Sequence, residues 1–185
     1  LHAVFGAVLA AALMIAFVVP PGMAIEQMPP PYDIEHWRAV LSYLQNHRQP
    51  GDEVYVFPLQ RIGMSFYGPS YGIEPQDWTT GVCSRDDSRA YIRDVDRYRG
   101  VRRLWVLSAS SRPFRVVREA VRKYLNTIGV RKESVEFPSL TMTSVSLELY
   151  DLSDAGRMAA VSAESFPVAP MPNDPRPGCR DWLKP

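Results

Sequence analysis

The sequence predicts a small three-layer α/β domain with a mostly parallel sheet and an antiparallel edge strand, preceded by one transmembrane helix. Three observations support this fold class. An uncharged apolar segment comes first, over residues 1–25. Helices with one apolar face then alternate with short, continuously apolar strands, the order that builds parallel sheets with right-handed crossovers. Near residues 145–149, apolar and polar residues alternate, which is typical of an antiparallel strand buried on one face.

The segment 1–25 contains no Lys, Arg, Asp or Glu. At about 1.5 Å per residue, its apolar run 3–19 and the flanking residues reach roughly 30 Å, the thickness of the hydrocarbon core of a bilayer. We therefore expect a transmembrane helix. A truncated signal peptide is one alternative, although only His2 stands where a basic region belongs. A buried helix is another, although such a helix usually shows a polar stripe.

The chain starts at Leu1 rather than at a methionine, so we expect the transmembrane helix to be the last span of a longer protein. A Pro-rich linker over residues 26–33 leads from it to the soluble domain, residues 34–153, and a Pro-rich tail covers residues 154–185. Proline-rich segments are stiff and extended. The tail is expected either to cross the domain as a strap, held by Cys179 and Trp182, or to be partly disordered.

Within the domain, helices are predicted where apolar residues recur every three or four positions, and strands where short apolar runs lie between turn residues. Aspartate and proline–glycine pairs mark several of the ends. In chain order we expect a helix from Asp33 to Pro50, a strand at 54–57, helices at 62–67 and 87–98, a strand at 104–107, a helix at 112–128, and strands at 131–137 and 145–149.

Charge and cysteine content exclude several function classes. The 21 basic and 20 acidic residues nearly cancel, whereas a nucleic-acid-binding domain usually carries a pronounced basic excess. Cys83 and Cys179 cannot form a tetrahedral zinc site by themselves, and the three histidines stand nowhere near them in the sequence. No Gly-rich phosphate loop follows the first strand, so no metal or other cofactor is expected. The two cysteines are either unrelated buried thiols or partners in a disulfide. Their turn-like surroundings and the preceding membrane segment favour the disulfide.

Two short motifs resemble catalytic signatures, but their spacing favours a structural role. The pattern G-x-S-x-x-G at residues 63–68 is one residue longer than a nucleophile elbow and does not directly follow a strand. Asp94 and Asp96 lie two positions apart within a predicted helix, so their carboxylates point in different directions and cannot hold one cation. We expect them to pair with neighbouring arginines. No catalytic residue is assigned.

Two surfaces are candidates for binding. Aromatic residues follow the first strand, where open α/β sheets bind ligands, and Tyr67, Tyr71 and Trp78 could stack on a sugar or an isoprenoid chain. They could equally pack their long loop onto the domain. Arg115, Arg118 and Arg122 form a basic stripe on the helix 112–128. The stripe is either a solvated face or a contact with anionic lipid headgroups.

Several sequence blocks together resemble a known family. They are the W-R-A-V-L-S-Y-L helix, Pro50-Gly51-Asp52 with its Val-Tyr-Val strand, Phe66-Tyr67-Gly68, the W-x-x-G of Trp78 to Gly81, Arg-Leu-Trp-Val-Leu at 103–107 and Leu-Tyr-Asp-Leu-Ser at 149–153. With the apolar helix before them, the blocks cover residues 1–153. This pattern resembles the C-terminal extracytoplasmic domain of bacterial membrane glycosyltransferases of the GT-C superfamily, the protein-mannosyltransferase-like group.

The resemblance implies an enzyme that transfers a sugar from a polyprenyl-phosphate donor outside the cytoplasm. In that group the catalytic acid lies in an early loop between membrane helices, which this chain does not contain. The domain would therefore be accessory, with membrane lipid and the lipid-linked donor as its partners and a place on the extracytoplasmic side of the cell membrane. The alternatives are a non-enzymatic, membrane-anchored α/β binding or assembly module, and a self-contained anchored hydrolase.

Overall fold

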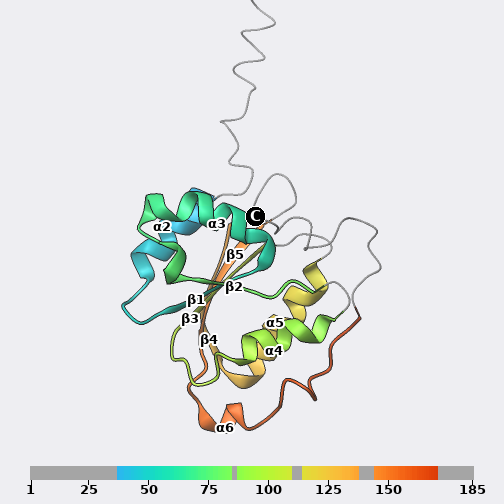
Figure 1. Ribbon diagram of the computed structural model, residues 1–185. Coiled ribbons are helices and arrows are strands. Elements are labelled where there is room, and N and C mark those ends of the chain that lie inside the picture. Colours follow the sequence, from blue (N-terminus) through green and yellow to red (C-terminus); the bar gives the residue numbers. More distant parts are fainter. Residues whose placement is uncertain (1–36, 85–86, 110–113, 138–143, 171–185) are drawn as a thin grey trace, which may run out of the picture. The chain divides into compact units, whose positions relative to one another are not determined.

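The computed structural model describes residues 37–84, 87–109, 114–137 and 144–170 (Figure 1). The chain separates into two units, Leu1–Tyr32 and Asp33–Pro185, and the fold described here is that of the second. The predicted transmembrane segment 1–25 and the linker 26–33 lie outside the described residues. Within the described part, none of the helices has both the length and the hydrophobicity needed to cross a bilayer.

The described residues form an α/β fold around one mixed five-stranded sheet of order β2-β1-β3-β5-β4. β1 runs parallel to β2 and to β3, whereas β5 runs antiparallel to β3 and to β4. The sheet thus combines a parallel half with an antiparallel half. The strands are β1 (Glu53–Val56), β2 (Thr79–Thr80), β3 (Leu104–Ala109), β4 (Val130–Phe137) and β5 (Val145–Asp151).

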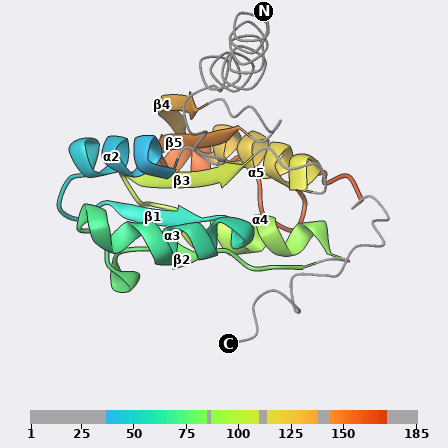
Figure 2. The ribbon, with the colours of Figure 1, turned by 90° about the horizontal axis from the view of Figure 1, so that it is seen from above.

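Helices cover both faces of this sheet, so the domain has three layers (Figures 1 and 2). Helices α2 and α3 lie together on one side, and α4 and α5 lie together on the other. For the described residues, this arrangement confirms the predicted α/β domain of three layers, with a sheet that contains parallel and antiparallel strands. The helices are α2 (Trp37–His47), α3 (Arg61–Tyr67), α4 (Ser88–Asp96), α5 (Arg115–Ile128) and α6 (Ala155–Met158), with short 3-10 turns at Pro58–Gln60, Gly68–Tyr71 and Pro75–Asp77.

Strand β3 explains why the domain has two apolar cores. All six of its residues are buried, and side chains alternate between the two faces of a strand. Leu104 and Val106 therefore join the core beneath α4 and α5, while Trp105 and Leu107 join the core beneath α2 and α3. A continuously apolar sequence is what a strand covered on both faces requires.

The strand predicted at residues 145–149 is antiparallel, as expected, but the expectation that it is buried on one face is wrong. Strand β5 lies between β3 and β4, and its residues Val145–Tyr150 are all buried. Its polar members Ser146 and Glu148 face the α5 side, where polar partners receive them. The exposed antiparallel edge strand is β4. A strand was predicted at this position of the chain, residues 131–137, but its place at the edge of the sheet was not predicted.

The part of the Pro-rich tail that the structure describes, residues 154–170, packs onto the α4 and α5 side of the domain. Ala163 and Phe166 are buried in that core, and the Phe166 ring contacts the Tyr124 ring edge to face, with 5.0 Å between their centroids. The proposed anchors of the strap, Cys179 and Trp182, lie outside the described residues.

Candidate functional site

The carboxyl ends of β1 and β3 form the position where a sheet of this kind is expected to bind ligands. The chain leaves β1 toward α3 on one face and leaves β3 toward α5 on the opposite face. Such a topological switch point opens a crevice in many open α/β sheets. The segment that follows β3, residues 110–113, lies outside the described residues.

The three aromatic residues predicted to contact a ligand are partly buried against the core beneath α2 and α3. Tyr67 stacks on Trp37, with 6.3 Å between the ring centroids and 19° between the planes. Tyr71 and Trp78 pack against the same cluster. These contacts favour the packing alternative for Tyr67, Tyr71 and Trp78. Phe66, which belongs to the same segment, is instead 74% exposed.

The three arginines of the basic stripe on α5 have different surroundings. Arg122 forms an ion pair with Glu148 at 2.6 Å, and Arg118 donates a hydrogen bond to the Ser146 hydroxyl at 3.3 Å. Both arginines therefore reach under the helix toward β5. Arg115 is exposed and lines a groove of about 370 Å³ between α5 and residues 167–169. Among these three, Arg115 is the one whose surroundings leave it open to lipid headgroups.

Glu148 is the centre of a buried polar cluster that sequence reasoning missed. Its side chain accepts hydrogen bonds from Arg131 at 3.0 Å and from the Tyr150 hydroxyl at 3.1 Å, in addition to the Arg122 ion pair. Burial opposes ionisation of Glu148, but its contacts with Arg122, Arg131 and Tyr150 outweigh this effect and hold its pKa below the usual value. A carboxylate that stays charged and fully bonded is suited to holding strands together rather than to proton transfer.

Asp52, from the Pro-Gly-Asp block, joins two of the blocks that carry the family resemblance. Its carboxylate accepts hydrogen bonds from Arg103 at 2.7 Å and from the Trp105 indole N–H at 2.8 Å. The backbone N–H of Gln49 donates to it at 3.0 Å. Burial opposes ionisation, but these hydrogen bonds lower the pKa of Asp52. The Pro-Gly-Asp turn and the Arg-Leu-Trp-Val-Leu strand are thereby tied together.

A second junction joins the W-x-x-G block to the Val-Tyr-Val strand. Gly81 lies so close to the Tyr55 hydroxyl that a Cβ atom at this position would overlap it. Tyr55 in turn donates a hydrogen bond to Asp94 at 2.9 Å, and the backbone N–H of Val82 donates to the same carboxylate oxygen at 2.7 Å. Position 81 requires glycine because Tyr55 occupies the space that any side chain at this position would need.

The two motifs that resemble catalytic signatures have structural surroundings, as predicted. Asp94 pairs with Arg97 at 3.3 Å, and Asp96 pairs with Arg99. Ser65 lies within α3 and is exposed, several residues beyond the end of β1. Among the described residues there is no group of three His, Cys, Asp or Glu side chains that could hold a metal ion.

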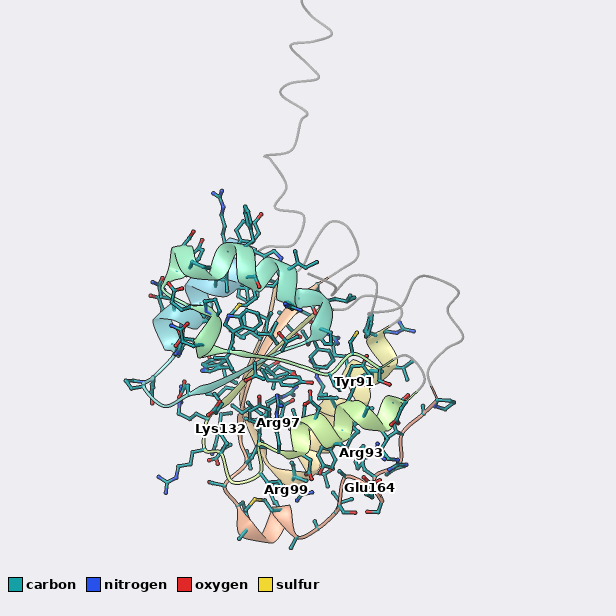
Figure 3. All side chains as sticks on the ribbon, in the orientation of Figure 1. Tyr91, Arg93, Arg97, Arg99, Lys132 and Glu164 are labelled. Atoms are coloured by element: carbon teal, nitrogen blue, oxygen red, sulfur yellow. The ribbon has the colours of Figure 1, made fainter. Side chains whose placement is uncertain are left out.

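Arginines of α4 hold the described part of the tail. Arg89 donates hydrogen bonds to the carbonyl oxygens of Ala163 and Phe166 at 3.1 and 3.0 Å. Arg93 forms an ion pair with Glu164 of the tail at 2.6 Å, and Figure 3 labels both residues. Cys83, just before α4, is disulfide-bonded. Cys179 lies outside the described residues, and its pairing with Cys83 stays a prediction.

Comparison with known proteins does not identify the chain. No protein-family model matches it, and neither a curated protein nor a solved structure matches it.

Proposed function

We propose that this chain is the C-terminal part of a membrane glycosyltransferase that uses a polyprenyl-phosphate-linked sugar donor, and that residues 37–170 form its non-catalytic accessory domain. The membrane helix precedes the domain, and the domain stands on the extracytoplasmic side. The catalytic residues belong to the membrane part of the enzyme, and the domain covers or orients the substrates.

The observation that supports this proposal is the way the sequence blocks of the resemblance meet in space. Asp52 of one block bonds Arg103 and Trp105 of another. Gly81 of a third block lies against Tyr55 of the first strand. Because these blocks interlock, they form the scaffold of the domain. A family of accessory domains with varied substrates would share such a scaffold.

The accessory role agrees with the surroundings of the titratable groups. Glu148 and Asp52, which are buried, have their carboxylate oxygens occupied by arginine, indole or hydroxyl donors. A general acid or base instead needs a free oxygen or nitrogen within reach of a substrate. His47, the one histidine among the described residues, bonds the Tyr43 carbonyl oxygen at 2.8 Å and stacks on the Tyr43 ring.

The test is sugar transfer by membranes that contain the whole protein encoded by the gene. Synthetic polyprenyl-phosphate sugars with a radiolabelled sugar serve as donors, and cell-envelope extracts serve as the source of acceptor. We expect label to move from the lipid to an acceptor. Membranes from cells without the gene are the control. Absence of transfer with every donor, despite normal amounts of folded protein, would favour the binding or assembly module instead.

A further inference from the structure

An exposed apolar row lies on the surface of α3 and the turn before it. Leu59, Ile62 and Phe66 are 38%, 59% and 74% exposed. Ile62 and Phe66 are four positions apart on α3 and therefore lie on the same face of the helix, and Leu59 lies in the 3-10 turn directly before it. We call these three residues the α3 row. The opposite face of the helix carries Met64, which is fully buried in the core.

Clustering distinguishes the α3 row from ordinary surface residues. Single exposed apolar side chains are common on soluble domains, whereas contiguous ones mark binding surfaces. Among the described residues, the other large apolar side chains that are exposed are Val82 and Val130, each at 37%, and they lie far apart in the sequence. The row therefore contains the three most exposed large apolar side chains of the described domain.

Helix α3, which carries the row, contacts the first described residue of the domain. Trp37, the first described residue, stacks on Tyr67 of α3 and occupies the space beside Gly63, where a Cβ atom would overlap its indole ring. The first residue that the structure describes thus packs against α3. The residues between the apolar segment and Trp37 are 26–36, and eleven residues span at most about 40 Å even when fully extended.

Two exposed basic residues belong to the helices that meet here. Arg61 is the first residue of α3, directly before Ile62, and Arg38 is the second residue of α2. An interfacial helix usually combines large apolar side chains that enter the headgroup region with Lys or Arg beside them. Basic residues next to a bilayer gain further from anionic lipids.

We infer that the α3 row is a membrane-contact surface, with Phe66, Ile62 and Leu59 in the headgroup region and Arg38 and Arg61 on lipid phosphates. This contact would fix the orientation of the domain on the bilayer and place α3, rather than the arginine stripe of α5, against the lipid. The inference rests on the membrane attachment in the proposed function, but it does not require sugar transfer.

Vesicle binding by residues 33–185, which form a unit of their own, tests this inference without the apolar anchor. Cosedimentation is measured with vesicles of phosphatidylcholine containing phosphatidylglycerol. We expect the fragment to bind. The double variant Ile62→Ser with Phe66→Ser should bind at least about tenfold more weakly, because neither position then transfers an apolar side chain from water to lipid. Circular dichroism checks that both proteins are folded. Val130→Ser, on the edge strand β4, is the matched control and should bind normally.

Vesicles of different lipid composition separate the electrostatic part of the contact from the apolar part. Arg38→Gln with Arg61→Gln should weaken binding to the mixed vesicles but leave weak binding to pure phosphatidylcholine unchanged. Equal binding of the Ile62 and Phe66 variant and the wild type would overturn the inference. Absence of binding by the folded wild-type fragment would also overturn it and would leave a protein partner as the occupant of the row. Either result is independent of the sugar-transfer assay.

Discussion

The indole N–H of Trp105 donates a hydrogen bond to the carboxylate of Asp52 at 2.8 Å, and both side chains are buried. Trp105 is the second residue of the central strand β3, whereas Asp52 precedes β1. The contact closes the amino ends of two neighbouring parallel strands. Because Arg103 also reaches Asp52, at 2.7 Å, the carboxylate stays ionised although its side chain is enclosed.

Replacing Asp52 with alanine should lower the free energy of unfolding by about 2–3 kcal/mol, because it leaves the Trp105 indole N–H buried without an acceptor. Urea denaturation of residues 33–185, followed by circular dichroism, measures the change. Glu53→Ala is the matched control, since the neighbouring carboxylate is exposed and its loss should cost no more than about 0.5 kcal/mol. Equal effects of the two changes would show that the Asp52 contacts contribute nothing.

Stability should fall in acid. The folded domain lowers the pKa of both Asp52 and Glu148, while unfolded aspartate and glutamate titrate near roughly 4. Below that value the unfolded chain binds more protons than the folded one, so stability is present above about pH 4 and is lost as the pH falls through the folded pKa values. Urea midpoints measured at a series of pH values test this. Asp52→Asn should flatten the acid limb, and an unchanged limb would contradict the assignment to Asp52.

Replacing Val106 with aspartate should prevent stable folding. Val106 is 2% exposed and lies directly opposite Glu148 in the antiparallel pair, so the new carboxylate would be buried beside an existing negative charge. The cost of several kcal/mol is comparable to a total stability of about 5–15 kcal/mol. Solubility and circular dichroism of the variant check the outcome.

Val145→Thr provides the comparison for this change. The alternation at residues 145–149 predicted a strand buried on one face, but Val145 is 2% exposed in an internal strand. A buried hydroxyl without an assured partner costs about 1–3 kcal/mol, so the threonine variant should fold with a lowered midpoint. If Val145→Thr destabilises the domain as much as Val106→Asp, the negative charge of Glu148 does not explain the predicted difference between the two variants.

Arg89→Ala should loosen the described part of the tail without unfolding the sheet. The guanidinium donates hydrogen bonds to the carbonyl oxygens of Ala163 and Phe166, and the substitution removes these bonds while the Arg93–Glu164 ion pair remains. Amide hydrogen exchange should become faster over residues 161–168 and stay unchanged in β3. The exposed Arg102 is the control, and Arg102→Ala should leave exchange over the tail unaltered.

The helices and the two apolar strands could be predicted because their signals are local. A continuous run such as 104–107 can be satisfied only by burial on both faces, and the structure buries β3 completely. The position of β5 could not be predicted in this way. Ser146 and Glu148 alternate with apolar residues, a pattern that resembles a solvent-exposed face. Their bonding partners, Ser108 and Arg122, come from elements distant in the sequence.

The candidate sites show the same limit. Aromatic residues of the loop after β1 were expected either to pack or to bind, and Tyr67 packs because Trp37, some thirty residues earlier, provides its stacking partner. Asp52 was visible in the sequence as a helix stop, yet its bonds to Arg103 and Trp105 depend on strand pairing. Local patterns therefore placed the elements along the chain, while the partners of each polar group required the tertiary structure.

The most direct test of the accessory role is the activity of residues 33–185 in isolation. The folded fragment is incubated with synthetic polyprenyl-phosphate sugars and, separately, with water-soluble sugar donors and acceptors, and the products are measured by mass spectrometry. We predict neither sugar transfer nor hydrolysis above a no-protein control, because the proposed function assigns the catalytic residues to the membrane part of the protein. Turnover by this fragment that disappears in its Val106→Asp variant would contradict the proposal and place an active site within the domain itself.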